Sequence, residues 1–266
     1  MSDSPILHVE SFGRLDSPCI VFLHGLAGST ASWGTPFRQI TNSHRVLLVD
    51  VSGFGRSPKP AIDYTLQDHV AALNATLLLH NVEQAHVVGH SMGALLALAF
   101  AAHQPTRVQG LALLAMPWHA SEAEARTKIG EQSLFNRWLA LETPLARVAC
   151  SVMCHLRPWL MPLMPRLIRD VPADVARDVL RHNWLSYSRS LKHLIIELKP
   201  AELLPLVNVP LLFIQGMKDK TAPPAPVASG IEGYANAQLQ TINAGHDMIF
   251  THAQSLANGI RNLLNQ

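Results

Sequence analysis

The segment AHVVGHSMGALLALAFAA, residues 85–102, constrains the fold of this chain more than any other part of the sequence. Residues 85–88 are apolar and mostly β-branched, which is typical of a buried parallel strand, and the residues from Met92 onward favour a helix. Ser91 lies in the turn between them, flanked by Gly89 and Gly93. Such a tight turn holds a serine in a strained conformation with its hydroxyl exposed, and glycines are needed where side chains would collide. A serine before a helix is commonly only an N-cap, so its role depends on the rest of the chain.

Strand-like and helix-like segments alternate along the first 116 residues. A capping-box pattern at residues 65–68 marks the start of one helix, whose apolar residues form a single stripe. This alternation predicts an α/β fold in which helices cover both faces of a mostly parallel sheet. The predicted strands are residues 6–12, 19–23, 44–50, 85–88, 108–115, 209–215 and 238–242.

The alternation stops at Pro117, and no strand pattern returns before about Pro200. This stretch contains helix-like segments separated by prolines, which predicts a helical cap inserted into the sheet. We therefore expect residues 1–116 and 201–266 to form the core domain and residues 117–200 to form the cap. Helices are predicted within the cap at residues 134–141, 145–156 and 174–198.

Composition excludes several classes of protein. The net charge is only +2 and no basic run exists, so a nucleic-acid partner is not expected. No apolar stretch is long enough to span a bilayer and no secretory signal pattern is present, which predicts a cytoplasmic protein. The three cysteines do not form a disulfide framework. A metal site is conceivable at Cys150, Cys154 and His155, which lie within about one helical turn. We interpret the cysteines instead as buried thiols. We expect no metal and no cofactor.

A serine becomes a nucleophile only when a base takes its proton and a third group orients that base. In open parallel sheets, functional residues gather in the loops that follow the carboxyl ends of strands. Of the 14 histidines, His246 lies just past the last predicted strand and is the predicted base. Asp219 follows the preceding strand and is the predicted orienting acid. Asp50 also ends a strand, but its loop is rich in turn residues, so we assign it a structural role.

The remaining residues near strand ends receive lesser roles. His24 and His90 are expected to shape their own loops, and Asp247 is expected to be a loop residue because it adjoins the predicted base. Acyl transfer also requires donors aimed at the developing oxyanion. The backbone N–H groups of Leu26 and Met92 are the predicted donors.

Five motifs together resemble the α/β-hydrolase superfamily, in its capped, esterase- and lipase-like serine-hydrolase branch. They are the His-Gly pair at 24–25, DVSGFGRS at 50–57, GHSMG at 89–93, GMKD at 216–219 and the Gly-His pair at 245–246. The order Ser, Asp, His along the chain is also that of the superfamily. Dehalogenases and epoxide hydrolases of this fold carry aspartate where this chain has Ser91, so the resemblance favours ester hydrolysis.

The resemblance implies a carboxylic ester hydrolase that forms an acyl-enzyme on small to medium apolar esters, without cofactor or metal. Carbon–carbon bond hydrolysis, lactone opening and perhydrolysis remain alternatives because the same three side chains serve all of them. A ligand receptor and a cofactor-free oxygenase are alternatives from other classes. The expected partner is a small ester-like molecule, with no nucleic acid and no integral membrane span.

The cap segment PWLMPLMP, residues 158–165, places many apolar side chains on a stretch broken by prolines. They could simply seat the cap on the core. The alternative prediction is that Trp159, Met161 and Met164 form the roof of the acyl pocket, where flexible methionines adapt to varied chains.

Overall fold

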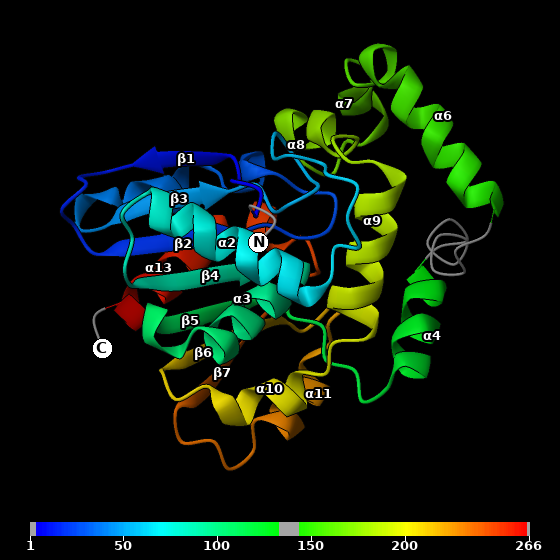
Figure 1. Ribbon diagram of the computed structural model, residues 1–266. Coiled ribbons are helices and arrows are strands. Elements are labelled where there is room, and N and C mark those ends of the chain that lie inside the picture. Colours follow the sequence, from blue (N-terminus) through cyan, green and yellow to red (C-terminus); the bar gives the residue numbers. More distant parts are fainter. Residues whose placement is uncertain (1–3, 133–143, 265–266) are drawn as a thin grey trace.

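A computed structural model describes residues 4–132 and 144–264 and contains one seven-stranded sheet (Figure 1). The strand order is β1-β3-β2-β4-β5-β6-β7, and all neighbouring strands are parallel except the β1/β3 pair. The predicted fold class is therefore confirmed. The strands are β1 (Val9–Phe12), β2 (Cys19–Leu23), β3 (Arg45–Val49), β4 (Ala85–His90), β5 (Val108–Leu114), β6 (Leu211–Gly216) and β7 (Ala237–Ile242).

Every residue of β2, β3 and β6 is buried, as expected for parallel strands that are covered by helices on both faces. Because side chains alternate along a strand, β2 contributes to two cores. Val21 and Leu23 pack in the core with helices α2 (Leu66–Leu79) and α3 (Met92–His103). Ile20 and Phe22 pack in the other core with α1 (Thr35–Arg38) and α13 (Ala253–Leu264). The sheet thus lies between two helical layers (Figure 1).

The predicted capping box at the start of α2 is present. The Thr65 side chain accepts a hydrogen bond from the backbone N–H of Asp68, and the Asp68 carboxylate accepts one from the backbone N–H of Thr65. Two orphan amide donors at the helix start are satisfied in this way.

Two short helices, α11 (Pro224–Gly230) and α12 (Met248–Thr251), follow β6 and β7.

The described residues that join β5 to β6, 115–132 and 144–210, contain helices and irregular segments but no strand. They gather at the carboxyl ends of the parallel strands (Figure 1). The division into core and cap at residues 117 and 200 stays a prediction. The helices of this region are α4 (Glu122–Gln132), α6 (Pro144–Leu160), α7 (Met164–Leu167), α8 (Ala173–Asp178), α9 (Trp184–Ser190), a π-helix (Leu191–Ile196) and α10 (Pro200–Leu203).

One helix prediction for this region was wrong, and the helix predicted at 145–156 is confirmed but ends later. The segment 174–198 is broken between α8 and α9, because the Asn183 side chain accepts a hydrogen bond from the backbone N–H of Ser186 and starts a new helix. Pro158 lies inside α6, which continues to Leu160 rather than ending near residue 156. The predicted helix at 134–141 lies outside the described residues. Within 4–132 and 144–264, no helix combines the length and the apolar character needed to cross a bilayer.

Candidate active site

The turn between β4 and α3 holds Ser91 in a strained backbone conformation, with φ 54° and ψ −119°. The two glycines of the turn are required by close packing. A Cβ on Gly89 would lie 2.2 Å from the carbonyl oxygen of Gly93, and a Cβ on Gly93 would lie 2.2 Å from that of Leu23. Because real Cβ atoms do not approach backbone so closely, both positions require glycine. The sequence therefore forms the tight strand-to-helix turn that was predicted.

Ser91, His246 and Asp219 form one hydrogen-bonded series. The Ser91 hydroxyl lies 3.0 Å from Nε2 of His246, and Nδ1 of the same ring lies 2.8 Å from Oδ2 of Asp219. With Nδ1–H donating to the carboxylate, Nε2 is free to accept the Ser91 proton, and this network assigns the tautomer. The side chains come from the loops after β4, β6 and β7, which end at the same edge of the sheet.

Asp219 is fixed by its own loop. Its Oδ1 accepts hydrogen bonds from the backbone N–H groups of Thr221 at 2.8 Å and Ala222 at 2.9 Å, so Oδ2 remains available to His246. Burial by itself raises the pKa of Asp219. The hydrogen bond and charge interaction with His246 and the two backbone donors outweigh burial, and the net pKa is lowered. The carboxyl is therefore held as a carboxylate beside the imidazole.

His90 contacts the loop that carries His246. Its Nε2–H donates a hydrogen bond of 3.0 Å to the backbone carbonyl of His246, and the two rings lie 5.1 Å apart. Burial, with the nearby His246 ring, lowers the pKa of His90 to about 3, so the ring is neutral and keeps one donor for that carbonyl. The sequence predicted only that His90 shapes its own loop. The link to His246 was missed because a strand-end position does not show which neighbour a side chain reaches.

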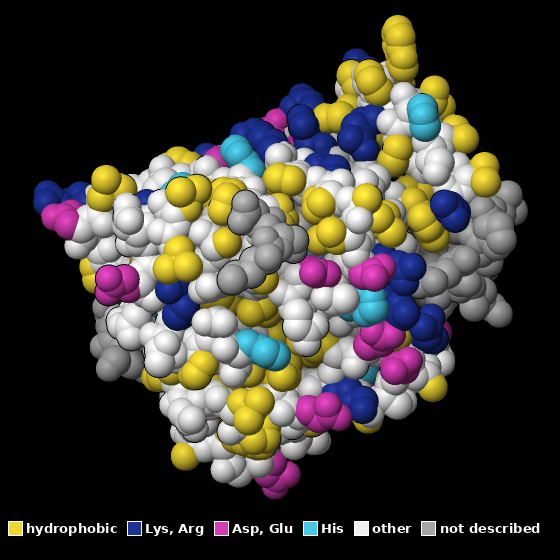
Figure 2. All heavy atoms as spheres, in the orientation of Figure 1, with side chains coloured by type: hydrophobic (Ala, Val, Ile, Leu, Met, Phe, Trp, Pro, Cys, Tyr) yellow, Lys and Arg dark blue, Asp and Glu magenta, His cyan; other side chains and the backbone are white. Residues whose placement is uncertain are grey.

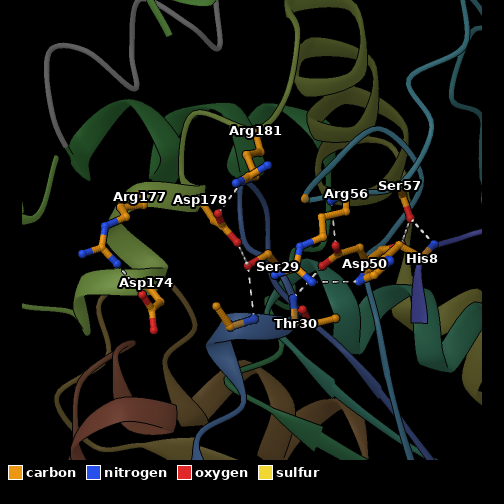
Figure 3. Close-up of polar contacts among 12 residues, drawn as sticks. His8, Ser29, Thr30, Asp50, Arg56, Ser57, Asp174, Arg177, Asp178 and Arg181 are labelled. Atoms are coloured by element: carbon orange, nitrogen blue, oxygen red, sulfur yellow. Dashed lines mark hydrogen bonds and ion pairs between the residues drawn. The ribbon is translucent and has the colours of Figure 1, made fainter. Parts of the chain in front are cut away.

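Asp50 holds two loops together and does not share the position of Asp219. Its Oδ1 accepts from the backbone N–H of Thr30 at 2.6 Å and its Oδ2 accepts from that of Arg56 at 2.7 Å (Figure 3). A Cβ on Gly55, where φ is +51°, would lie 2.3 Å from the Asp50 carboxylate. His24 supports the same region, because its Nε2 accepts from the backbone N–H of Val51 at 2.9 Å. Both oxygens of Asp50 thus serve the backbone, as the sequence predicted.

A cavity of about 310 Å³ opens beside Ser91 and His246. The core contributes the loops that follow β2, β4, β6 and β7, and the helical connection between β5 and β6 contributes mainly aliphatic side chains. Lys128 also faces the cavity, and its Nζ is paired with Oε1 of Glu124 at 2.7 Å. The aliphatic residues contributed by that connection are Ile129, Ile168, Val171, Val175, Ala176, Val179, Leu191 and Ile195.

The two residues predicted to supply the oxyanion donors lie close to Ser91. Leu26 lines the cavity, and Met92 is the first residue of α3. The loop of Leu26 packs directly on the turn, because a Cβ on Gly25 would lie 3.3 Å from Cβ of Ser91. A backbone N–H at the start of a helix also points outward without an intrahelical partner. The role of these amides as oxyanion donors stays a prediction.

The structure contradicts the prediction that Trp159, Met161 and Met164 line the pocket. None of the three contributes to the cavity wall, and Trp159 is 78% exposed. The physical reason is that α6 does not stop at Pro158 but continues past it and carries Trp159 outward. The chain returns to the cavity only at Ile168, after α7. The roof is therefore built from residues that follow the predicted segment.

One hydrogen bond ties the helical connection to the core beside the cavity. The Ser29 hydroxyl donates to Oδ2 of Asp178 at 2.8 Å, and the other carboxylate oxygen of Asp178 is 2.5 Å from Nε of Arg181 (Figure 3). Ser29 directly follows the loop of Leu26, and Asp178 ends α8, which carries Val175 in the cavity wall. The sequence offered no signal for this pair, which lies 149 positions apart.

Cys150 and Cys154 are explained by packing. Burial raises the pKa of the Cys150 thiol to about 12, so it remains protonated. The Cys154 thiol donates to the backbone carbonyl of His182 at 3.3 Å. Over residues 4–132 and 144–264, no cluster of three or more His, Cys, Asp or Glu side chains is arranged to hold a metal ion.

Comparisons with known proteins show a family and a fold. A family model described as the alpha/beta hydrolase fold matches residues 18–141. The chain is 32% identical over 192 residues to the probable lysophospholipase BODYGUARD 4 of Arabidopsis thaliana, an alignment that covers 66% of this chain and 45% of that protein. It is also 27% identical over 244 residues to the putative carbamate hydrolase RutD of Stutzerimonas stutzeri, covering 90% and 89% of the two chains.

The chain thus spans less than half the length of the Arabidopsis relative. Among solved structures, the enol-lactonase from Burkholderia xenovorans LB400 superposes with a TM-score of 0.75 at 22% identity and covers 98% of this chain and 96% of that one. An esterase from Exiguobacterium antarcticum superposes with a TM-score of 0.74 at 17% identity, covering 98% and 96%. At these identities, the two structural likenesses concern the fold alone.

Proposed function

Because the chain belongs to the α/β-hydrolase superfamily, and because Ser91, His246 and Asp219 form one hydrogen-bonded series, we propose that it is a serine hydrolase of carboxylic esters. The observation that carries this proposal is the pair of contacts made by His246, 3.0 Å to the Ser91 hydroxyl and 2.8 Å to the Asp219 carboxylate. An imidazole placed between a hydroxyl and a carboxylate can take a proton from the first while the second stabilises its charge.

In the proposed mechanism, Oγ of Ser91 attacks the ester carbonyl carbon while Nε2 of His246 takes the hydroxyl proton. The Asp219 carboxylate stabilises the resulting imidazolium, and the backbone N–H groups of Leu26 and Met92 receive the developing oxyanion. The C–O bond to the alcohol then breaks, and His246 returns the proton to the leaving oxygen. Water attacks the acyl-enzyme with His246 again as base, which releases the acid and restores Ser91.

The cavity supports a small to medium apolar acyl group as substrate. Its volume of about 310 Å³ and its mainly aliphatic wall suit a short hydrocarbon chain better than a highly polar one. Lactone opening, carbon–carbon bond hydrolysis and perhydrolysis use the same three side chains, so they are outcomes to be distinguished by substrate. The names of two relatives, a lysophospholipase and a carbamate hydrolase, are consistent with attack on a carbonyl group.

A panel of p-nitrophenyl esters and lactones of graded chain length tests the proposal, with Ser91→Ala as the decisive variant. We expect kcat to fall by roughly 10⁴ or more in Ser91→Ala, because removal of the nucleophile leaves only binding and oxyanion stabilisation. Circular dichroism would verify that the variant is folded. Near wild-type turnover by folded Ser91→Ala would exclude the acyl-enzyme mechanism.

A fluorophosphonate probe separates this function from the other classes. An activated Ser91 should be labelled within minutes, whereas the idle serine of a ligand receptor or of a cofactor-free oxygenase should label poorly. His246→Ala serves as the matched control, because it leaves the hydroxyl in place and removes the base. Equal labelling of wild type and His246→Ala would show that His246 does not activate Ser91.

A further inference from the structure

An apolar stripe on the outside of the molecule runs along α6 and continues through α7. On α6 it consists of Val148, Val152, Leu156 and Trp159, all exposed. Their spacings of four, four and three residues place them on one face of the helix. Leu163, just before α7, and Leu167, at its end, continue the exposed series.

The opposite face of α6 attaches the helix to the protein. Cys150 is buried, and Cys154 and Arg157 both donate hydrogen bonds to the backbone carbonyl of His182. The stripe is therefore the side of α6 that points away from the body of the molecule. Figure 1 shows α6 and α7 projecting beyond the sheet and its flanking helices, and Figure 2 shows hydrophobic side chains gathered over these two helices.

The charged residues within 144–169 have a single sign, and the first acidic residue after them is the exposed Asp170. Residues 144–169 contain four arginines and no aspartate or glutamate, although the whole chain has 21 basic and 19 acidic residues. Arg147, Arg166 and Arg169 are exposed. Figure 2 shows Lys and Arg side chains alongside the hydrophobic ones at this end of the molecule. An apolar face whose own segment, residues 144–169, carries only positive charges is complementary to a surface with an apolar interior and negatively charged head groups.

We propose that this surface, residues 147–169, docks on an anionic lipid surface. Leucine, valine and tryptophan side chains at the head-group boundary would bury apolar area, while arginines reach phosphate groups with their long side chains. Tryptophan is also favoured at membrane–water interfaces.

The docking surface adjoins the cavity in the sequence. Leu167 is the last residue of the stripe, and the next residue, Ile168, lines the cavity together with Val171. Contact with a lipid surface would thus place one wall of the cavity close to that surface. An amphiphilic substrate could then reach the cavity from the lipid layer. The docking itself does not depend on the proposed ester hydrolysis, and it is tested by binding.

Vesicle flotation provides the test, with the full chain and with vesicles of phosphatidylcholine alone or mixed three to one with phosphatidylserine. We expect the protein to float with the mixed vesicles and to bind phosphatidylcholine vesicles at least tenfold more weakly, because each cation near an anionic surface contributes about fivefold to binding. High salt should release the protein from the mixed vesicles. Equal binding to both vesicle types, or no binding to either, would overturn the proposal.

Two pairs of matched variants locate the contact. Trp159→Ser with Leu163→Ser should reduce binding at least tenfold, whereas Leu15→Ser with Leu206→Ser, which also removes two exposed apolar side chains, should not. Arg166→Glu with Arg169→Glu should abolish binding, whereas the charge-matched Arg14→Glu with Arg261→Glu should not. All four should hydrolyse a soluble ester at wild-type rates if ester hydrolysis holds.

Retained binding by both surface variants would overturn the proposed docking site. Sedimentation velocity addresses the other occupant of an apolar face, a second copy of this chain. A concentration-dependent dimer that disappears in the Trp159→Ser, Leu163→Ser variant, without vesicle binding by wild type, would replace the lipid surface with a self-association interface.

Discussion

The two walls of the cavity are built on different physical principles. The wall supplied by the sheet consists of polar atoms in fixed positions: Ser91 in a strained turn, His246 between two partners, and Asp219 anchored by two backbone amides. The wall supplied by the helical connection consists mainly of aliphatic side chains on α8, on the π-helix and on the segment after α7. Two hydrogen bonds that join this wall to the core are the one from Ser29 to Asp178 and the one between His69 of α2 and Ser190, which precedes the π-helix.

This difference indicates how each wall responds to change. Hydrogen-bonded groups depend on distance and direction, so the loss of one atom removes a function. Aliphatic walls depend on volume and apolar area, so conservative replacements alter the fit gradually. We therefore expect substitutions in the sheet wall to change kcat by orders of magnitude, and substitutions in the helical wall to change substrate preference by small factors.

The largest effect should come from Asp219→Asn. An amide cannot stabilise the imidazolium, and its NH₂ group favours the wrong tautomer of His246, so kcat should fall by about 10⁴ while the fold is retained. Steady-state kinetics with a p-nitrophenyl ester would measure this loss. A folded Asp219→Asn enzyme within tenfold of wild type would show that the carboxylate is not needed for turnover.

Asp50→Asn is the matched control, since Asp50 is also a buried carboxylate at a strand end. The substitution should cost about 1–3 kcal/mol of unfolding free energy, because a single amide oxygen replaces two carboxylate oxygens and leaves the amide of Thr30 or Arg56 unpaired. Its effect on kcat should be far smaller than that of Asp219→Asn. Urea unfolding and kinetics on the same preparations would detect a reversal of the two roles.

A smaller effect concerns stability in mild acid, to which buried histidines such as His90 and His182 contribute. Burial lowers the pKa of His90 to about 3 and that of His182 to about 4, below their ordinary value of 6.5. At pH values between the lowered pKa of each histidine and 6.5, the unfolded chain binds a proton that the folded chain does not. The free energy of unfolding is therefore highest above pH 6.5 and decreases as the pH falls. Each histidine should cost about 1 kcal/mol between pH 7 and pH 5.5.

Urea unfolding at the two pH values, for wild type, His90→Gln and His182→Gln, would test this. Glutamine does not titrate, so each variant should lose less stability on acidification than wild type does, whatever its stability at pH 7. The exposed His155→Gln serves as the control for replacing a histidine outside the core. Wild-type pH dependence in both buried-site variants would contradict the assignment.

The helical wall should show its effect in chain-length preference. Each methylene buried from water contributes about 0.8 kcal/mol, so kcat/KM should rise about three- to fourfold per methylene until the cavity is full. Val175→Thr with Val179→Thr introduces two hydroxyl groups at nearly unchanged shape, and should flatten this rise. Val148→Thr with Val152→Thr, on the outer face of α6, is the matched control and should leave it intact.

The sheet wall was predictable from sequence for a physical reason. Parallel strands end at one edge, so residues that directly follow β4, β6 and β7 had to lie near one another. Ser91, Asp219 and His246 were identified by that rule, and the structure places them in hydrogen-bonding contact. The contact between His90 and the His246 carbonyl was not predictable, because the rule gives no side-chain directions.

The helical wall was not predictable because aliphatic residues carry no directional signal. Ile168 and Trp159 are both apolar residues in proline-rich surroundings, yet one lines the cavity and the other is exposed. The distinction depends on where α6 ends, and prolines proved a poor guide, since Pro158 lies within the helix. The contact of Ser29 with Asp178 depends on how α8 packs against the core, which no local pattern encodes.

The smallest effect is expected for the methionines that the sequence analysis placed in the pocket. Met161 and Met164 lie between α6 and the point at Ile168 where the chain returns to the cavity, and neither contributes to its wall. Met161→Ser and Met164→Ser should therefore leave the rise of kcat/KM with chain length unchanged, within about twofold at every length, because no methylene of a bound acyl chain loses an apolar neighbour. The rise of kcat/KM with chain length in these variants should be compared with that in Val175→Thr, Val179→Thr. The compared variants should have equal melting temperatures, so that a difference in stability does not affect the comparison. A flattened slope in either methionine variant would show that α7 moves onto the cavity when substrate binds.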